Sequence, residues 1–302
     1  MIKKLLSIIC ASSLVFSLHS CQDRLEEEDT YKIPLNISLD GVGQQSRGPL
    51  ANNSFSPGDS IGLCVVDGSD TKYENMDYSN VKFSASFAEE EGELVWNAEN
   101  DIMLSGTGGT LYAYYPYGKD IDIKQIPVDM STQTDWLYAE RIDDISNVNY
   151  TQTIVMHHAL ANIKLNMVKD NYIGKGELSQ VIVKSGGLAQ KAVLNARTGE
   201  LSSISMVGAP VAVDTDITIS STPSQVDVLV LPTTEKSPVE IAAVVDSKTY
   251  KIESDEVNIE SGNSYCFNVL HTAEGLKITS VQITPWVNND QDEDLTLIKP
   301  LK

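Results

Sequence analysis

Apolar and polar residues alternate along most of this 302-residue chain, as they do in β-strands that bury one face. In the first half the alternation runs through residues 33–39, 81–87 and 111–117. In the second half it returns at residues 226–231, 239–245 and 276–286. The runs are short, and Gly, Pro, Asn and Asp separate them, which is typical of β-sandwiches. The pattern therefore predicts an all-β chain with little helix.

One segment, residues 154–168, admits more than one interpretation. Apolar residues share strand parity through it, and the alternation is clean from Ile163 onward. We therefore expect one long strand, bulged at His157 and His158. A helix over residues 157–164 is the alternative.

The first 20 residues are typical of the signal peptide of a bacterial lipoprotein. Two lysines open it, and an apolar stretch at residues 5–16 follows that is too short to span a bilayer. Leu18-His19-Ser20-Cys21 then resembles a lipobox, although His19 stands where a small residue is usual. We expect cleavage between Ser20 and Cys21 and lipidation, including palmitate, of Cys21. An ordinary secretory peptide with a chance cysteine is the alternative.

Residues 21–30 form an acid-rich stretch that cannot bury apolar surface, so we expect a disordered tether. It resembles the surface-export signal of Bacteroidetes lipoproteins, and a plain solvated linker is the alternative. Loss of the signal peptide removes two lysines and no acid, which leaves 20 basic and 42 acidic residues and a net charge of −22. Such a charge argues against nucleic acid and against electrostatic docking on anionic lipid as partners.

The roughly 280 residues of the mature chain are too many for one small core and suit two domains. We expect one domain at residues 31–153 and a second at residues 154–302. No later apolar run approaches the length of a membrane-spanning helix, so we expect membrane contact through the lipid alone.

One segment matches a catalytic motif in sequence but not in its expected structural context. Gly58-Asp59-Ser60-Ile61-Gly62 matches the G-x-S-x-G nucleophile elbow and also opens like the block of GDSL-type esterases. An elbow needs a serine between a strand and a helix, whereas Ser60 here leads into a strand-like run. The D-x-x-H motif of GDSL-type enzymes is absent near the C-terminus. We therefore expect no enzyme activity.

Metal and cofactor sites are not expected either. His157 and His158 are adjacent in a strand, so their side chains should point to opposite faces and cannot chelate one ion together. Residues 288–294 are rich in oxygen ligands but lack the glycine and glutamate spacing of an EF-hand. We interpret this segment as a solvated acidic linker, with a calcium site as the alternative.

Cysteines and tyrosines allow a structural and a functional interpretation. Cys64 and Cys266 lie in strand-like runs far apart in the sequence, so we expect two inert buried thiols. Four tyrosines near the strand at residues 111–117 suggest either a sugar-binding platform or a strand with one buried aromatic face; they are Tyr112, Tyr114, Tyr115 and Tyr117.

Taken in order, several short motifs resemble the fimbrillin family of Bacteroidetes, whose members are subunits of type V pili. They follow the lipobox and the first strand, and they span nearly the whole mature chain. The motifs are Ser54-Phe55-Ser56-Pro57-Gly58-Asp59-Ser60-Ile61-Gly62-Leu63, Leu111-Tyr112-Ala113-Tyr114-Tyr115-Pro116-Tyr117, Asp135-Trp136-Leu137-Tyr138-Ala139, His158-Ala159-Leu160-Ala161-Asn162-Ile163 and Ile283-Thr284-Pro285-Trp286.

The resemblance implies an all-β fold of two tandem transthyretin-like Greek-key β-sandwich domains and export to the cell outer membrane. In the major stalk subunits of the family, an arginine-specific protease removes the first strand, and the C-terminal strand of another subunit fills the groove. Arg47 is the candidate cleavage site, and residues 31–39 are the strand it would release. Leu295, Leu297 and Ile298 are the candidate donor strand.

The leading hypothesis is thus a structural or adhesive subunit of a surface-exposed fimbria, with other fimbrial subunits, identical or paralogous, as partners. The alternative is a monomeric surface lipoprotein that binds a glycan or a host or bacterial surface ligand. The role as stalk, tip or anchor subunit stays open. Asp59-Ser60-Ile61 also resembles the Bacteroides O-glycosylation motif, which predicts a glycan on Ser60.

Overall fold

The computed structural model describes residues 31–40, 55–88 and 94–286. Within them, strands dominate, and the two helices are the short 3₁₀ turns η2 (Tyr73–Asn75) and η3 (Met130–Thr132). The prediction of an all-β fold is confirmed. No helix in this part of the chain is long and apolar enough to cross a membrane.

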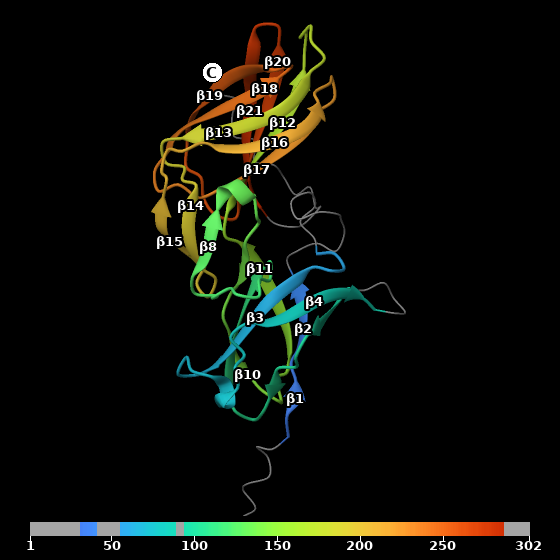
Figure 1. The fold of residues 1–302 in the computed structure, drawn as a ribbon, viewed down its shortest axis with the longest axis vertical. Helices are drawn as coiled ribbons and strands as arrows, with labels where there is room; N and C mark the ends of the chain where they lie inside the picture. The colour runs from blue at the N-terminus through green and yellow to red at the C-terminus, as the bar shows by residue number, and fades with distance from the viewer. Residues whose placement is uncertain (1–30, 41–54, 89–93, 287–302) are drawn as a thin grey trace, which may run out of the picture.

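The strands follow one another along the whole described chain (Figure 1). Those of the N-terminal half are β1 (Ile33–Pro34), β2 (Asn36–Asp40), β3 (Ser60–Asp67), β4 (Val81–Phe87), β5 (Leu94–Ala98), β6 (Met103–Leu104), β7 (Gly109–Tyr115), β8 (Ile126–Asp129), β9 (Leu137–Ala139), β10 (Ile142–Ile145) and β11 (Thr151–His158). Those of the C-terminal half are β12 (Ala161–Lys169), β13 (Glu177–Ser185), β14 (Lys191–Asn195), β15 (Glu200–Ser205), β16 (Val211–Thr218), β17 (Ser224–Val230), β18 (Ser237–Val245), β19 (Lys248–Val257), β20 (Asn263–Thr272) and β21 (Gly275–Pro285).

An eight-stranded sheet organises the N-terminal half. Its strand order is β2-β11-β9-β7-β3-β4-β5, with β10 joined to β7, and β1 and β6 form a separate two-stranded ladder. The alternation in β4 buries Val81, Phe83 and Ala85 on one face, as predicted. Their side chains join one hydrophobic core with those of β3, β7 and β11.

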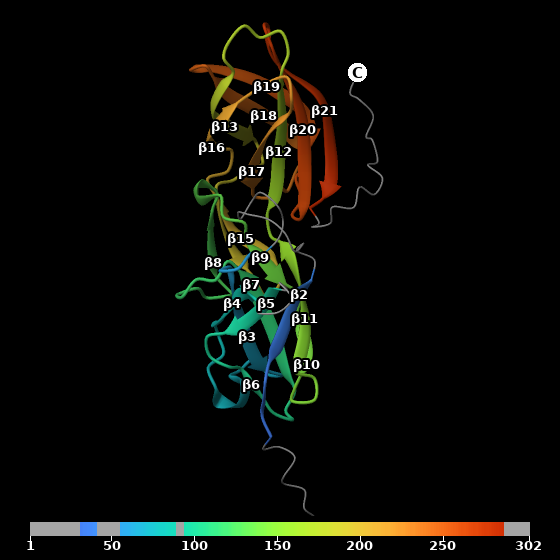
Figure 2. The same ribbon diagram turned by 90° about the vertical axis from the view of Figure 1, so that its right-hand side faces the viewer.

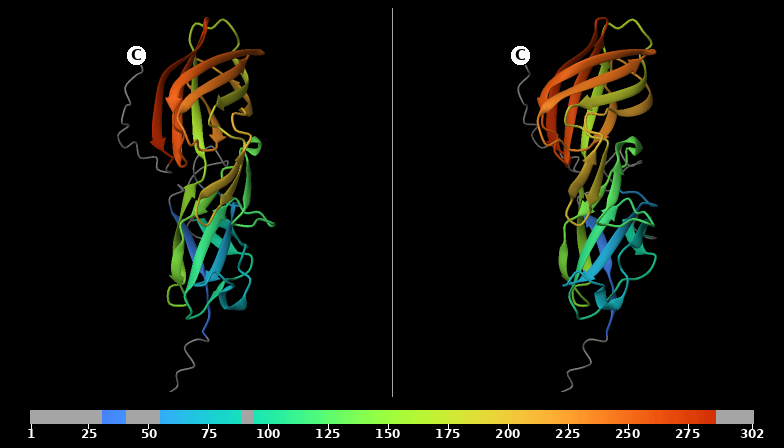
Figure 3. Two further views of the ribbon diagram at one scale, coloured as in Figure 1. Left: turned by 90° about the vertical axis from the view of Figure 1, so that its left-hand side faces the viewer. Right: turned by 60° about the vertical axis from the view of Figure 1, so that its left-hand side comes forward.

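Two four-stranded sheets form the C-terminal half, in the orders β17-β12-β20-β21 and β16-β13-β18-β19. Residues from both sheets pack into a second core, with Val181, Ile241 and Phe267 fully buried. Figure 3 shows these sheets at the end of the molecule opposite to the N-terminal sheet. The two sheets and their shared core agree with the predicted sandwich.

A three-stranded sheet, β15-β14-β8, joins the halves because β8 comes from the first and the hairpin β14–β15 from the second. The loop of this hairpin approaches the N-terminal half closely. Gly199 has φ +72°, and a Cβ atom there would overlap the ring of Tyr138. Glycine is therefore required by both the backbone angle and the contact.

The prediction of one long strand over residues 154–168 is wrong, as is the helical alternative. The chain forms β11 and β12, and the interruption falls at Ala159 and Leu160 rather than at a bulge. The Ala159 N–H donates to the Trp136 carbonyl at 2.9 Å, and the Leu160 carbonyl accepts from the Gly262 N–H at 2.9 Å. Because distant segments take these backbone groups, the ladder ends there.

The interruption also marks the passage between the two halves. β11 pairs with β2 and β9 of the N-terminal sheet, whereas β12 pairs with β17 and β20 of the C-terminal half. The passage at residues 159–160 thus lies after the boundary predicted at residue 153.

Candidate strand-exchange site

The first described strand segment lies at the edge of the N-terminal sheet. β1 pairs with β6, with Ile33 opposite Leu104, and β2 pairs in parallel with β11 alone. Figure 2 shows β2 beside β11 along the length of this half. Pro34 offers no N–H, and the ladder with β6 ends at this residue. The predicted single strand is thus two short strands, joined at Leu35.

The inner face of this segment is part of the N-terminal core. Leu35 and Ile37 keep only 6% and 5% of their surface exposed, and they share a cluster with Ile102, Leu104 and Met156. Burial of each such side chain stabilises the fold by roughly 1.5–3 kcal/mol. Removal of the segment would therefore uncover apolar surface worth about 3–6 kcal/mol by the same estimate.

Polar ties to the segment are few and exposed. The Asn36 N–H donates to the Tyr150 carbonyl at 2.8 Å, and Ser38 Oγ lies 3.1 Å from Thr153 Oγ1. The Lys32 ammonium pairs with Glu74 and holds the pKa of that carboxyl below its usual value. An ion pair as exposed as this one contributes little. Apolar burial, the short ladder of β1 with β6 and the parallel ladder of β2 with β11 therefore hold the segment in place.

The last described residue, Trp286, directly follows the edge strand β21 at the junction of the two halves. Its indole ring stacks on the imidazole of His158, with ring centroids 3.6 Å apart and planes at 5°. His158 Nδ1 lies 3.0 Å from Asp135 Oδ1, and the Trp286 N–H donates to the Gly262 carbonyl. Trp286 therefore lies beside the end of β11, the strand that pairs with β2.

The other residues predicted for processing and exchange lie outside the described part of the chain. They are Ser20, Cys21, Arg47, Leu295, Leu297 and Ile298. The structure thus gives the position of the first strand and of Trp286, the last described residue.

The model of the fimbrillin-like family matches residues 49–286, which is more than half of the chain. The chain belongs to the fimbrillin-like family. The match ends at Trp286 and begins after the first strand, so it covers the body of the fold. No curated protein gives a significant match to this chain.

Solved structures of low sequence identity share the fold of this fimbrillin-like protein. A proposed cell adhesion protein from Bacteroides uniformis is 17% identical, with a TM-score of 0.66 over 84% of this chain and 98% of that one. One from Bacteroides ovatus is 20% identical, with a TM-score of 0.60 over 86% and 100%. One from Bacteroides fragilis is 12% identical, with a TM-score of 0.58 over 85% and 100%.

The serine motif of this fimbrillin-like protein does not form a nucleophile elbow. Ser60 starts β3 instead of preceding a helix, and its Oγ lies 3.0 Å from Ser84 Oγ. Asp59 holds the turn, since its carboxylate accepts from the Ser56 N–H at 2.7 Å and the Tyr115 hydroxyl at 3.2 Å. Ser60 is half-buried, and a glycan on it, which stays a prediction, would have to displace the bond to Ser84.

The two adjacent histidines point to opposite faces, as the strand period predicts. His157 is half-exposed and faces Glu140, with Nε2 3.7 Å from the carboxylate, whereas His158 is buried against Trp286. In the described residues, no group of three or more His, Cys, Asp and Glu side chains could hold a metal ion.

The tyrosines of β7 are largely core residues. Tyr112 and Tyr114 are buried, and Tyr114 donates to Asn80 Oδ1 at 2.8 Å, while burial raises its pKa to about 12. The two inner tyrosines therefore do not offer an open aromatic platform. The structure favours the buried-face interpretation of this strand.

The two cysteines in the described part of the chain, Cys64 and Cys266, differ in environment. Cys64 is buried, as predicted, whereas Cys266 is half-buried, so the expectation of a second fully buried thiol is wrong. Cys266 lies in β20 beside Asn166, whose Nδ2 donates a hydrogen bond to the Cys266 sulfur at 3.2 Å. Burial raises the pKa of both thiols. Both therefore stay protonated and poorly reactive at neutral pH.

A buried histidine in the C-terminal half predicts loss of stability in mild acid. His271 stacks on Tyr172, with ring centroids 3.9 Å apart, and neither ring nitrogen has a hydrogen-bond partner among the described residues. Burial, with a smaller effect of Lys169, lowers its pKa below 6.5, against the opposing influence of Asp246. As the pH falls below about 6.5, His271 is therefore protonated more readily in the unfolded chain than in the folded one, which favours unfolding.

We expect the free energy of unfolding to decrease as the pH falls from about 7.5 to 5.5, and to decrease less in His271→Phe. Urea denaturation at several pH values measures this slope. The matched variant His157→Gln, at a half-exposed histidine, should keep the wild-type slope. Equal slopes in wild type and His271→Phe would show that His271 does not cause the acid sensitivity.

Proposed function

We propose that this fimbrillin-like protein is a structural or adhesive subunit of a cell-surface fimbria that assembles by strand exchange. The observation that carries the proposal is the edge position of β2, which pairs with one strand and buries Ile37, while Leu35, just before β2, is buried beside it. A strand held in this way can be replaced by a strand of the same pattern from another chain. Backbone hydrogen bonds would supply binding, and alternate side chains would fill the vacated pockets.

Arg47 follows the first strand at a distance of only seven residues from Asp40. Cleavage there would turn a covalently attached strand into a separate peptide, which can dissociate. The C-terminal residues 287–302 carry Leu295, Leu297 and Ile298, of which Leu295 and Leu297 have the spacing of one face of an inserted strand. The acidic residues before them supply the reach to a neighbouring subunit.

We expect cleavage after Arg47 by an arginine-specific protease to convert a monomer into oligomers. Light scattering after size-exclusion chromatography would measure the mass. Arg47→Lys should resist the protease and stay monomeric; of the two arginines that the structure describes, Arg141 directly precedes β10 and Arg197 is mostly buried. A cleaved chain without residues 287–302 should also stay monomeric. Cleaved full-length protein that remains monomeric at high concentration would contradict exchange and favour the monomeric, ligand-binding alternative.

Anchoring at the outer membrane by a lipid on Cys21 is the second part of the proposal. It rests on the leader and on the motif Leu18-His19-Ser20-Cys21. We expect cells fed with labelled palmitate to incorporate the label into the wild type and not into Cys21→Ala. Cys64→Ala serves as a control, because its thiol is buried. Equal labelling of the wild type and Cys21→Ala would exclude Cys21 as the lipidated residue.

A further inference from the structure

A polar cleft of about 650 Å³ lies where the loop after β14 meets the N-terminal half. We name it the arginine cleft, because both arginines in the described part of the chain line it. The lining residues that matter here are Asp70, Tyr112, Lys124, Arg141, Arg197 and Thr198. Its volume is within the range of small-molecule sites, about 300–1,000 Å³.

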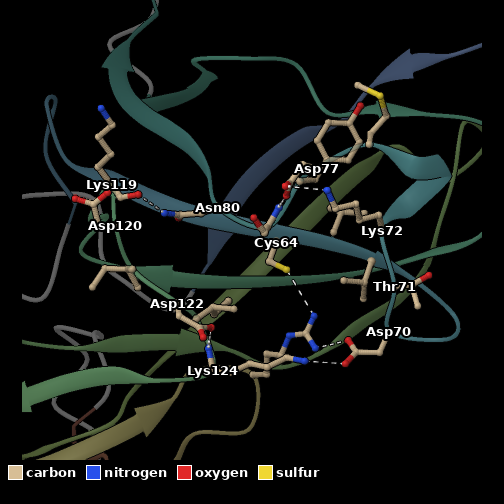
Figure 4. Close-up of a pocket in the computed structure, with 18 residues that line it drawn as sticks. Cys64, Asp70, Thr71, Lys72, Asp77, Asn80, Lys119, Asp120, Asp122 and Lys124 are labelled. Atoms are coloured by element: carbon tan, nitrogen blue, oxygen red, sulfur yellow. Dashed lines mark hydrogen bonds and ion pairs between the residues drawn. The ribbon is translucent and has the colours of Figure 1, made fainter.

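The ion pairs at the cleft leave an excess of positive charge. Asp70 pairs with two cations, Arg197 and Lys124, and the Lys124 Nζ lies 2.9 Å from its carboxylate (Figure 4). Hydrogen bonds from these two residues hold the pKa of Asp70 below its usual value, so it stays ionised. Two cations on one acid give this cluster a net charge of +1.

The five charged residues that line the cleft, Asp67, Asp70, Lys124, Arg141 and Arg197, sum to a charge of +1. Hydrogen bonds from Thr71 and Ser69 hold the pKa of the Asp67 carboxyl below its usual value, so Asp67 stays ionised and offsets one cation. Arg141 restores the excess within the lining, and its partner Asp143 lies outside the lining. The chain as a whole carries −20, yet charges beyond a Debye length of about 8 Å are largely screened at physiological salt. Local cations therefore decide which ligand the cleft attracts.

Two arginines have complementary roles in the cleft. Arg197 is held rigidly, with a side chain only 9% exposed and its guanidinium carbon 4.4 Å from the centroid of the Tyr112 ring. Arg141 is 56% exposed, and among the described residues its only side-chain partner is Asp143, through Nε. Its two terminal nitrogens are thus available for the two-pronged binding of a carboxylate.

Neutral polar groups accompany the cations. Thr198, Ser69 and Asn195 line the same cleft and offer hydroxyl and amide groups to a ligand rich in hydroxyls. A second cavity of about 700 Å³ adjoins it, because Val66, Asp70, Lys124 and Arg197 line both. Figure 4 shows the side chains of this second cavity, among them Lys119 and Asp122. Together the two cavities extend the site beyond the space that one sugar ring needs.

We propose that the arginine cleft binds a saccharide that carries a carboxylate, such as a uronic or sialic acid residue of a glycan. Arg141 and Lys124 would bind the carboxylate, and the neutral polar groups would bind the ring hydroxyls. Asp70 and Tyr112 would keep Arg197 and Lys124 in place. This site is independent of strand exchange, because none of its residues belongs to the first strand or to residues 287–302.

Ligand-observed NMR titration of the uncleaved protein tests the proposal. Methyl β-D-glucuronide and methyl β-D-glucoside differ by the carboxylate alone, and N-acetylneuraminic acid tests the second class of acidic sugar. We expect at least one acidic sugar to bind at least tenfold more tightly than the glucoside. Affinity should fall at least tenfold in Arg141→Gln and in Lys124→Gln, and less in Arg141→Lys, which keeps the charge.

The matched control is Lys251→Gln, which removes an exposed lysine that pairs with Glu240 at 3.0 Å on a different sheet. It should bind as the wild type does, and thermal melting would show that every variant is folded. Equal affinity for glucuronide and glucoside, no binding of any acidic sugar, or full affinity in Arg141→Gln would overturn the proposal. Acetate that binds as tightly as the acidic sugars would overturn the saccharide part.

Discussion

Replacement of Leu35 and Ile37 by alanine is expected to lower the free energy of unfolding by about 2–5 kcal/mol for each single variant. Both side chains are more than nine-tenths buried in the N-terminal core, and each alanine would leave a cavity there. Typical domains are stable by only about 5–15 kcal/mol, so the double variant should approach the limit of folding. Urea denaturation of the two single variants measures the effect.

The opposite face of the same strand supplies the control. Asn36 and Ser38 are exposed, so Asn36→Ala and Ser38→Ala should each change the stability by less than about 1 kcal/mol. If Leu35→Ala and Ile37→Ala cost no more than these two, the first strand would not close the core. Its release would then create no groove, and strand exchange would lose its driving force.

Trp286→Ala is expected to lower the free energy of unfolding by about 3–5 kcal/mol. The indole is buried at the junction of the two halves, where it stacks on His158, which in turn contacts Asp135. Loss of the ring would leave a cavity where the end of β21, the end of β11 and the loop before β9 meet. Trp286→Phe keeps an aromatic ring against His158 and should cost less.

Ile283→Ala is the matched control for the tryptophan. Ile283 lies three residues earlier, in β21, but is 40% exposed, so its truncation should cost less than about 1 kcal/mol. Chemical denaturation of Trp286→Ala, Trp286→Phe and Ile283→Ala measures the three losses of unfolding free energy. Similar losses for Trp286→Ala and Ile283→Ala would mean that the junction contributes no special stability, and that Trp286 does not fix where the C-terminal segment departs.

Alternation predicted the strands well wherever one sheet face is buried. β4 occupies the residues that the pattern marked, and Leu35 and Ile37 point into the core because the side-chain period of a strand is two. Such patterns report burial, which is a local property of the sequence. They cannot report which distant backbone groups will compete for hydrogen bonds.

The break between β11 and β12 shows this limit. Apolar alternation continues through Ala159 and Leu160, yet hydrogen bonds to Trp136 and Gly262 end the ladder there. Those partners come from loops that precede and follow by tens of residues. The sequence correctly predicted strand conformation before and after residues 159–160. The division of the segment between two sheets depends on tertiary contacts, which the pattern does not report.

The arginine cleft could not be predicted from the sequence for a related reason. Its residues come from the loop after β3, from β7, from the stretch before β8, from the link between β9 and β10 and from the loop after β14. Of the residues that matter here, only Tyr112 belongs to a motif, and the charged ones look like ordinary surface residues in isolation. The signals available were this tyrosine-rich strand and the scarcity of arginine, since the whole chain has four.

The most direct test of strand exchange is an engineered disulfide between two copies of the protein. Thr153 faces the first strand, where Ser38 Oγ lies 3.1 Å from its hydroxyl. One copy would carry Thr153→Cys, and the second would carry a single cysteine at one of residues 295–298. Both copies would start after Cys21 and have Cys64 and Cys266 replaced by serine.

We predict that cleavage after Arg47 in the Thr153→Cys copy allows a disulfide to form between the two copies. It should form best at alternate positions of residues 295–298, because alternate side chains of an inserted strand share one face. Ile173→Cys, at a residue 99% exposed in the loop after β12, should give no such preference. Non-reducing electrophoresis and peptide mass spectrometry would detect the link. The absence of a link after cleavage, or equal linking without cleavage, would contradict strand exchange.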